Sequence, residues 1–279
     1  MLCESIFLRE NEGDKNVRLD TYVSKQYGDM ADIAPRDCML ILPGGAYYGH
    51  AERESEPVAK AFMARGFNCF VLYYSVGEEN ARFPRPLKDV SMAIAHIRRN
   101  AERYNIDPER IFLCGFSAGG HLAASAGVFW NQDIAAFEGM EKGENRPAGM
   151  VLCYAVSTLG EFSHDICVRL VTGKGDPTPE ERAVYSPDRH IDSDTVPAFI
   201  WHTASDGDVK VQNALIMAKA LVEKGIPTEL HVYPFGPHGM SVATEETRCN
   251  IPENVNPHVA HWVDDCCEWT KLIFADTSK

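Results

Sequence analysis

The sequence predicts an α/β fold, a doubly wound and mostly parallel sheet flanked by helices. Two observations predict it. Short apolar runs rich in Val, Ile, Leu and Phe alternate along the chain with longer amphipathic stretches. Each run is continuous rather than alternating with polar residues, which is typical of strands buried on both faces. Repeated alternation of strand and helix favours a parallel sheet.

Six apolar runs are predicted to be strands, and longer stretches between them to be helices. Residues 86–104 keep an apolar stripe at i, i+3 and i+4, and two other stretches end at Gly66 and Gly225, which are natural helix stops. The predicted strands are 37–43, 68–74, 110–115, 149–155, 197–203 and 228–234. The predicted helices are 54–65, 86–104, 211–224 and 257–274.

The chain of 279 residues, of which 45% are hydrophobic, is expected to form one domain over residues 1–279. Two segments do not fit the alternation. Residues 131–147 are polar and contain Gly and Pro, and residues 156–196 carry two Thr/Pro clusters with little periodicity. Long irregular connections in a compact domain tend to be functional or mobile, so we expect both segments to be lid or cap insertions.

The charge of the chain disfavours two classes of partner. The formal net charge is −13 at pH 7, and an acidic surface repels both nucleic acids and anionic membranes. No stretch approaches the roughly 20 apolar residues of a membrane span, and the first residues do not resemble a signal peptide. A small-molecule substrate is the expected partner. The oligomeric state stays open, a homodimer included.

Nine cysteines are present, an odd number, and several lie within apolar runs. Reduced, buried thiols behave as small apolar residues. No paired CxxC or Cys/His cluster indicates a metal site, so we expect no metal. The cysteines are therefore interpreted as free thiols in a reducing compartment, and a cytoplasmic protein is expected.

A candidate nucleophile lies in Gly-Phe-Ser-Ala-Gly, residues 115–119, which matches G-x-S-x-G. The five letters alone are a weak signal. Here they directly follow the predicted strand 110–115 and directly precede a run of small residues that reads as a helix. A strand–turn–helix context is what this motif needs, because the turn strains the backbone and leaves no room for side chains beside it. Ser117 is the predicted nucleophile.

A second Gly-rich loop, Leu-Pro-Gly-Gly-Ala-Tyr-Tyr-Gly-His at 42–50, follows an early strand. Acyl transfer creates a negatively charged oxygen, which backbone N–H groups stabilise by about 3–4 kcal/mol per donor. In the fold that carries G-x-S-x-G, the donors come from the residue after the nucleophile and from such a loop. The predicted donors are the N–H groups of Ala118 and of Gly45 or Ala46.

A serine nucleophile needs a histidine base and an acid that orients it. His238 is the best placed of ten histidines, since it follows the last predicted strand. The acid is expected in the loop after strand 197–203, where Asp206 lies three positions before Val209 and Asp208 is the competitor. The order Ser117, Asp206, His238 is that of the α/β-hydrolases.

Four stretches carry a family resemblance, and they extend from about residue 37 to the C-terminal helix. They resemble the small acetyl esterases of the α/β-hydrolase family, the acetylxylan-esterase-like or feruloyl-esterase-like proteins, which are related to hormone-sensitive-lipase-like esterases. The stretches are LPGGAYYGHAERESEPVAKAF (42–62), FPRPLKDVSMAIAHIRRNAERYNIDPERIFLCGFSAGGHLAAS (83–125), PAFIWHTASDGDVKVQNAL (197–215) and ELHVYPFGPHGMS (229–241).

The resemblance implies hydrolysis of carboxylic esters with short acyl groups, such as acetyl on sugars, without a cofactor. It implies the triad Ser117, Asp206 and His238. Around it, the entrance is expected to be lined by the segment 131–147 and by four aromatic side chains that suit a sugar or an aromatic alcohol. These side chains are Tyr47, Tyr48, His50 and Trp130.

The sequence departs from the family pattern at the oxyanion loop. Pro43-Gly44-Gly45-Ala46 stands where lipase-like proteins often have His-Gly-Gly-Gly, and the methyl group of Ala46 would narrow the acyl pocket. Three other functions stay open: an amidase or peptidase of the same fold, an aryl-formamidase, and a ligand-binding homologue without catalysis.

Overall fold

The computed structural model describes residues 1–25, 28 and 34–275. Within them, one sheet of eight strands runs in the order β1-β2-β4-β3-β5-β6-β7-β8. The pairs β1–β2 and β2–β4 are antiparallel, and the remaining pairs are parallel. The strands are β1 (Ser5–Arg9), β2 (Asp14–Tyr22), β3 (Arg36–Leu42), β4 (Asn68–Tyr73), β5 (Ile106–Phe116), β6 (Gly149–Cys153), β7 (Ala198–Thr203) and β8 (Thr228–Tyr233).

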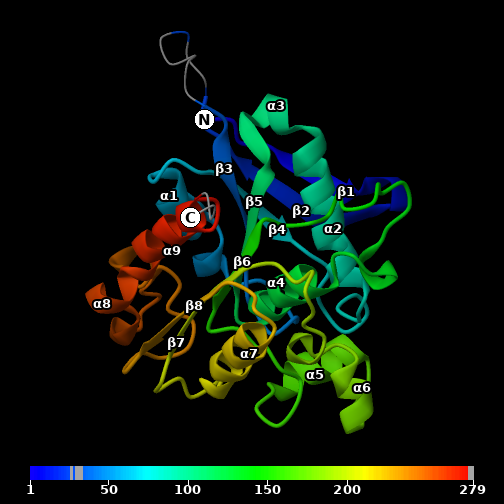
Figure 1. Cartoon of the computed structure of the whole chain (residues 1–279), viewed down its shortest axis with the longest axis vertical. Coiled ribbons are helices and arrows are strands. Elements are labelled where there is room, and N and C mark those ends of the chain that lie inside the picture. The colour runs from blue at the N-terminus through cyan, green and yellow to red at the C-terminus, as the bar shows by residue number, and fades with distance from the viewer. Residues whose placement is uncertain (26–27, 29–33, 276–279) are drawn as a thin grey trace.

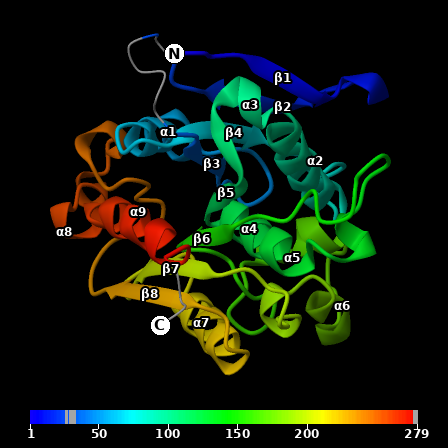
Figure 2. The same ribbon diagram turned by 45° about the horizontal axis from the view of Figure 1, so that its top comes forward.

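Helices cover both faces of this sheet. Figure 2 shows α1 and α9 on one side, with α2, α4 and α7 on the other. Within the described ranges, no helix has both the length and the apolar composition that crossing a membrane requires. The α-helices are α1 (Glu56–Met63), α2 (Arg85–Arg99), α3 (Ala101–Tyr104), α4 (Ala118–Phe129), α5 (Asp165–Thr172), α6 (Pro179–Ala183), α7 (Gln212–Glu223), α8 (Pro257–Ala260) and α9 (Trp262–Leu272).

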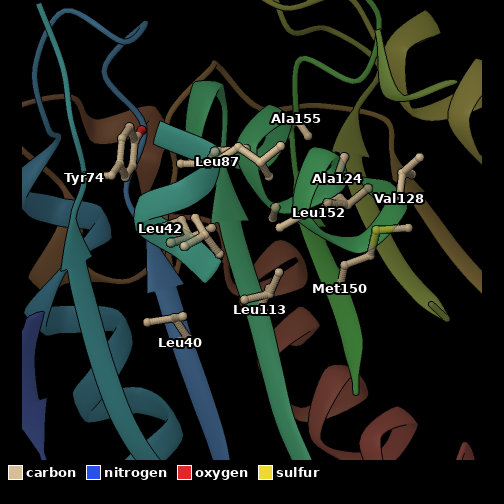
Figure 3. Packing of buried hydrophobic residues seen from close by; sticks show 14 of the residues in the cluster. Leu40, Leu42, Tyr74, Leu87, Leu113, Ala124, Val128, Met150, Leu152 and Ala155 are labelled. Carbon is tan, nitrogen blue, oxygen red and sulfur yellow. The ribbon is translucent and has the colours of Figure 1, made fainter. Parts of the chain in front are cut away.

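The core consists of two apolar layers, one on each face of the sheet. Successive side chains of a strand point to opposite faces, so Leu40 and Leu42 of β3 pack toward α2 and α4 while Met39 and Ile41 pack toward α1 and α9. Figure 3 shows the first layer, where Leu113 and its strand neighbours lie beneath side chains of α2 and α4. Burial on both faces explains why the apolar runs in the sequence are continuous.

The predicted fold class is confirmed, and the six predicted strands correspond to β3 through β8. Two predicted helices are each divided in the structure, at Asn100 between α2 and α3 and at His261 between α8 and α9. The strands β1 and β2 were not predicted from the sequence. These strands form the antiparallel margin of the sheet, and β1 has exposed or half-buried residues at most positions, so it has no continuous apolar run.

The connections at the carboxyl ends of the parallel strands carry the candidate site. Ser117 follows β5, Asp206 follows β7 and His238 follows β8. The segment 156–196 also starts at this edge, after β6, and forms α5 and α6, which lie at the opposite end of the molecule from α3 (Figure 1). Its role as a lid or cap stays a prediction.

The segment 131–147 lies at the other edge of the sheet, contrary to the expectation that it lines or covers the entrance. It joins the end of α4 to the start of β6. Arg98 at the end of α2 donates to the carbonyl of Arg146 at 2.8 Å, and Arg99 pairs with Glu144 at 2.6 Å. Because α4 begins at the carboxyl edge and returns to the amino edge, the connection that follows it must lie at the amino edge.

Candidate active site

Ser117 lies in the sharp turn between β5 and α4. Its backbone has φ 52° and ψ −115°, a strained conformation for a residue with a side chain. The turn also needs glycine on both sides. A Cβ atom at Gly119 would lie 2.1 Å from the carbonyl oxygen of Leu42, and one at Gly115 would lie 2.2 Å from that of Gly119. The close approach of backbone to backbone therefore fixes where the Ser117 hydroxyl projects.

The imidazole of His238 joins the serine to a carboxylate. Its Nε2 lies 2.8 Å from Ser117 Oγ, and its Nδ1 lies 2.8 Å from Asp206 Oδ2. A carboxylate can only accept, so Nδ1 carries the proton and Nε2 is left as the acceptor for the Ser117 O–H. The structure thus brings together the three residues that the sequence analysis selected, in the tautomer that a general base needs.

Asp206 is held rigidly as an anion. Burial opposes its ionisation, but hydrogen bonds from His202 and His238 and from the Val209 N–H outweigh burial and hold its pKa below the usual range. Its Oδ1 accepts from the backbone N–H groups of Asp208 and Val209, at 2.9 Å each. The Asp208 side chain is exposed, and the Nδ1 of His238 pairs with Asp206 instead.

The loop after β3 lines the same cleft as Ser117 and has backbone N–H groups without partners among the described residues. Gly45 and Ala46 have φ values of 126° and 55°, and within the described part of the chain their N–H groups have no hydrogen-bond acceptor. Ala118 is the first residue of α4, so no carbonyl of that helix accepts from its N–H. Donors without partners beside a nucleophile are what an oxyanion hole requires.

A cleft of about 420 Å³ opens above these groups. Among the described residues that line it, the aliphatic side chains are only those of Ala46 and Ala51, and the rest are polar, charged or aromatic. In the described residues, no three His, Cys, Asp or Glu side chains gather as a metal site. The lining residues are Gly45, Ala46, Tyr48, Gly49, His50, Ala51, Arg53, Glu54, Ser117, His164, Asp208 and His238.

Of the four aromatic residues expected at the entrance, Tyr48 and His50 line the cleft. Tyr48 is 68% exposed, and burial lowers the pKa of His50 to about 4. Tyr47 does not line it. Its ring is fully buried, and its hydroxyl lies 2.7 Å from Nδ1 of His121. A left-handed backbone at the consecutive positions 46 and 47 turns this ring into the core.

Trp130 also lies away from the cleft, contrary to expectation. It follows the last residue of α4, a helix of 12 residues that starts beside Ser117. Such a helix is about 18 Å long, at 1.5 Å per residue. The Trp130 indole N–H donates to the carbonyl of Asp194 at 2.9 Å, and the Arg146 guanidinium lies 5.3 Å from the ring centre. Trp130 therefore packs against the connection between α4 and β6, at the amino ends of the parallel strands.

Four residues around the candidate triad were not predicted from the sequence to belong to the site. Arg53, Glu54 and His164 line the cleft, and His202 lies 3.3 Å from Asp206 Oδ2. Burial, followed by the charge of His238, lowers the pKa of His164. One signal was available for Glu54, a charged residue four positions after the end of the Gly-rich loop 42–50. His164 lies in an irregular segment and gives no such signal.

Comparison with known proteins places the chain in a family. The model of the family described as BD-FAE matches residues 19–221. Among curated proteins, an endo-1,4-beta-xylanase B of Butyrivibrio fibrisolvens is 39% identical over 77% of this chain and 34% of its own length. An acetylxylan esterase of Xylanibacter ruminicola is 26% identical over 73% of this chain and 41% of its own length. The chain thus spans well under half the length of these two curated relatives.

A solved structure covers almost the whole chain. It is the acetyl ester-xyloside bifunctional hydrolase of Caldicellulosiruptor lactoaceticus, with 33% sequence identity and a TM-score of 0.81. The match covers 97% of this chain and 96% of that one. The resemblance drawn from the sequence motifs is confirmed at the level of the family.

Proposed function

Because the chain belongs to the BD-FAE family, we propose that it is a serine hydrolase that cleaves small carboxylic esters through an acyl-enzyme on Ser117. One observation carries the proposal: a single imidazole, that of His238, lies 2.8 Å from Ser117 Oγ and 2.8 Å from Asp206 Oδ2. The base is then in hydrogen-bond reach of both the nucleophile and the orienting acid, which is the geometric requirement of nucleophilic acyl transfer.

In the first step, Ser117 Oγ attacks the ester carbonyl and its proton passes to Nε2 of His238. Asp206 fixes the imidazole tautomer and stabilises the imidazolium. The carbonyl oxygen becomes an oxyanion, which the N–H groups of Ala118 and of Gly45 or Ala46 stabilise. The C–O bond to the alcohol then breaks, and the alcohol leaves with the proton held by His238.

In the second step, water attacks the acyl-enzyme and gives its proton to Nε2 of His238. The same N–H groups stabilise the second oxyanion. When the bond to Ser117 Oγ breaks, the proton returns to the serine and the carboxylic acid is released. No cofactor takes part in either step.

The lining of the cleft supports a short acyl group and a polar alcohol, such as an acetylated sugar. A buried methylene group contributes about 0.8 kcal/mol when its surroundings are apolar. The only aliphatic side chains here are those of Ala46 and Ala51, so a longer acyl chain gains little. Arg53, His164 and Asp208 offer polar groups to an alcohol. The acetyl-ester activities named for two similar proteins point the same way.

Replacing the nucleophile tests the reaction. Ser117→Ala should lower kcat for an aryl acetate by at least about 10⁴-fold, as in other dissected triads. The variant should also fail to react with a fluorophosphonate probe while keeping the wild-type melting temperature. Turnover by Ser117→Ala at the wild-type rate would refute the proposal.

A substrate panel tests the choice of ester. Turnover of aryl acetate should exceed that of butyrate and octanoate, and acetylated xylose or xylo-oligosaccharides should be deacetylated. The same panel includes an anilide, a peptide amide and an N-formyl arylamine. Faster cleavage of an amide or formamide, with loss in Ser117→Ala, would favour the amidase or formamidase alternative.

The cysteines support a reducing compartment, and the cytoplasm is the location we propose. All nine are free in the structure, including Cys114 and Cys153, whose Sγ atoms are 3.9 Å apart without a bond. Thiol titration of the denatured protein, purified without reductant, should find nine free thiols. A smaller and reproducible number of free thiols per chain, which would mean that stable disulfides had formed, would contradict this location.

A further inference from the structure

We propose that Glu54, acting with Tyr154, is a positioning residue that holds the oxyanion loop and the imidazole of His238 at a fixed distance from each other. The inference rests on the proposed function, because the two parts it joins are those that the hydrolysis would use.

The Glu54 carboxylate links two segments that are far apart in sequence. It is only 1% exposed, although it borders the cleft. Its Oε2 accepts from the N–H of Gly44 at 2.8 Å, directly before the proposed donors Gly45 and Ala46. Its Oε1 accepts from the Tyr154 hydroxyl at 2.8 Å. One side chain thus contacts the oxyanion loop and the residue after β6.

Tyr154 carries the connection on to the histidine. Its ring packs edge-on against the His238 imidazole, with centres 4.9 Å apart and planes at 70°. Its hydroxyl also accepts from the Ser241 N–H at 2.9 Å, three residues after the histidine. Burial, followed by the charge of Glu54, raises the pKa of Tyr154, so the hydroxyl keeps the proton that it donates to Glu54.

A second set of bonds from the neighbouring residue supports the same connection. Arg53 donates from Nε to the carbonyl of Gly239 at 2.7 Å, directly after His238. The Ser241 hydroxyl donates to the carbonyl of Arg53 at 2.6 Å. Arg53 therefore contacts the loop after β8 that carries His238, residues 234–241 (the histidine loop), at Gly239 and Ser241. Glu54 contacts the oxyanion loop at Gly44 and reaches His238 through Tyr154.

A purely stabilising role does not explain a carboxylate at this place. In the described part of the chain, Glu54 forms no ion pair, and its hydrogen-bond donors are the neutral Gly44 N–H and Tyr154 O–H. Burying a carboxyl group whose partners are all neutral is costly, because the group loses its hydration without gaining a charged partner. What the carboxylate does supply is two acceptors on one rigid group, which set the spacing between the oxyanion donors and the base.

Three substitutions test the two hydrogen bonds that Glu54 accepts, one from Gly44 and one from Tyr154. Glu54→Leu removes both acceptors. Glu54→Gln keeps an oxygen for Gly44 and turns its amide group toward Tyr154, and Tyr154→Phe keeps the ring against His238 but removes the hydroxyl. A displacement of about 1 Å can cost about 10²-fold in rate. We therefore expect kcat to fall about 100-fold in Glu54→Leu and about tenfold in each of the other two, with KM within threefold of wild type.

The pair is also tested for coupling. Glu54→Gln and Tyr154→Phe disturb the same hydrogen bond, so the double variant should lose no more than about threefold beyond either single variant. The rate of fluorophosphonate labelling should fall in parallel with kcat, because it needs the same serine, base and oxyanion donors.

Asp89→Asn is the matched control. Asp89 is a buried carboxylate outside the cleft that accepts from the Ser75 N–H at 2.8 Å and pairs with Arg9 at 2.6 Å. This variant should lower the melting temperature but keep the wild-type kcat per labelled active site.

The proposal is overturned if Glu54→Leu keeps kcat per labelled site within threefold of wild type. Where Glu54→Leu does not fold, the same result in both Glu54→Gln and Tyr154→Phe overturns it. It is equally overturned if these variants lose only thermal stability, as the control does. Comparison of wild type with Ser117→Ala comes first. Failure of the proposed function would appear there as absent Ser117-dependent turnover, whereas failure of this inference leaves that turnover intact in all the Glu54 variants.

Discussion

Replacing Asp206 by Asn tests the candidate triad most sharply, because it changes one atom and keeps the shape of the side chain. Asp206 Oδ1 accepts from two backbone N–H groups at 2.9 Å, and Oδ2 accepts from His238 at 2.8 Å. An asparagine in this place satisfies the backbone groups with its oxygen. Its NH₂ group then faces Nδ1 of His238.

The consequence is a wrong tautomer. Facing a donor, Nδ1 gives up its proton, and the proton moves to Nε2, which can then no longer accept from the Ser117 hydroxyl. A change of this kind lowers kcat by about 10⁴-fold in a well-studied triad enzyme. That factor corresponds to about 5.4 kcal/mol of transition-state stabilisation, at 1.36 kcal/mol per factor of ten. We expect a loss of the same order here, with KM little changed.

The assay is aryl acetate hydrolysis at neutral pH, with active sites counted by fluorophosphonate labelling. Asp208→Asn is the matched variant, since it lies two residues away in the same loop with an exposed side chain. It should cost less than tenfold. A loss below tenfold in Asp206→Asn would refute the reasoning, and a larger loss in Asp208→Asn than in Asp206→Asn would identify Asp208 as the orienting acid.

Three further predictions concern α4 and the residue that follows it. Burial lowers the pKa of His121 to about 4, so its neutral form contributes stability that is lost as the pH falls from about 6.5 to 4. By 1.36 kcal/mol per pKa unit, the loss is about 3 kcal/mol. Denaturant unfolding should find a flatter pH profile in His121→Gln, and equal profiles would contradict this. Gly119→Ala, whose Cβ would lie 2.1 Å from the Leu42 carbonyl oxygen, should lower the unfolding free energy by at least about 3 kcal/mol. Gly175→Ala, with open space around it, should change it by less than about 0.5 kcal/mol, and similar losses in both would be inconsistent with the packing. Trp130→Phe, at the far end of α4, should leave kcat and KM for aryl acetate within twofold, and a tenfold change would mean that this residue does reach the substrate.

The parallel part of the fold was predictable because its physical cause is visible in the sequence. A strand covered on both faces must be apolar at every position, as Cys38 through Leu42 are, and this leaves a continuous run. The strand β2 lies toward the antiparallel margin, and polar residues such as Arg18 and Asp20 occur between its buried ones. Pattern alone does not separate such a strand from a surface loop.

The candidate triad was predictable because each residue follows a recognisable strand. Chain order then places Ser117, Asp206 and His238 at one edge of the sheet. The same rule, applied to 131–147, would have placed that segment at the opposite edge, since it follows a helix rather than a strand. The error at Trp130 therefore came from not using the topology that the sequence had already indicated.

The errors and omissions close to the cleft have another cause. Tyr47 and Tyr48 are adjacent in sequence, yet one ring is fully buried and the other is 68% exposed. Which ring points inward depends on left-handed φ values of 55° and 62° at Ala46 and Tyr47, and residue types do not encode these angles. Glu54 was missed because its partner Tyr154 is 100 positions away.

The bonds of Arg53 to the histidine loop have a consequence for how the protein reaches its working state. They join residues separated by 186 and 188 positions. Contacts of such long sequence separation close large loops and slow the folding of the parts that depend on them. On a growing or refolding chain, the serine turn between β5 and α4 can form before the final strand exists, but the cleft is complete only when both ends of this long loop meet. Reactivity toward a fluorophosphonate during refolding would then report the last stage of folding rather than the formation of the sheet.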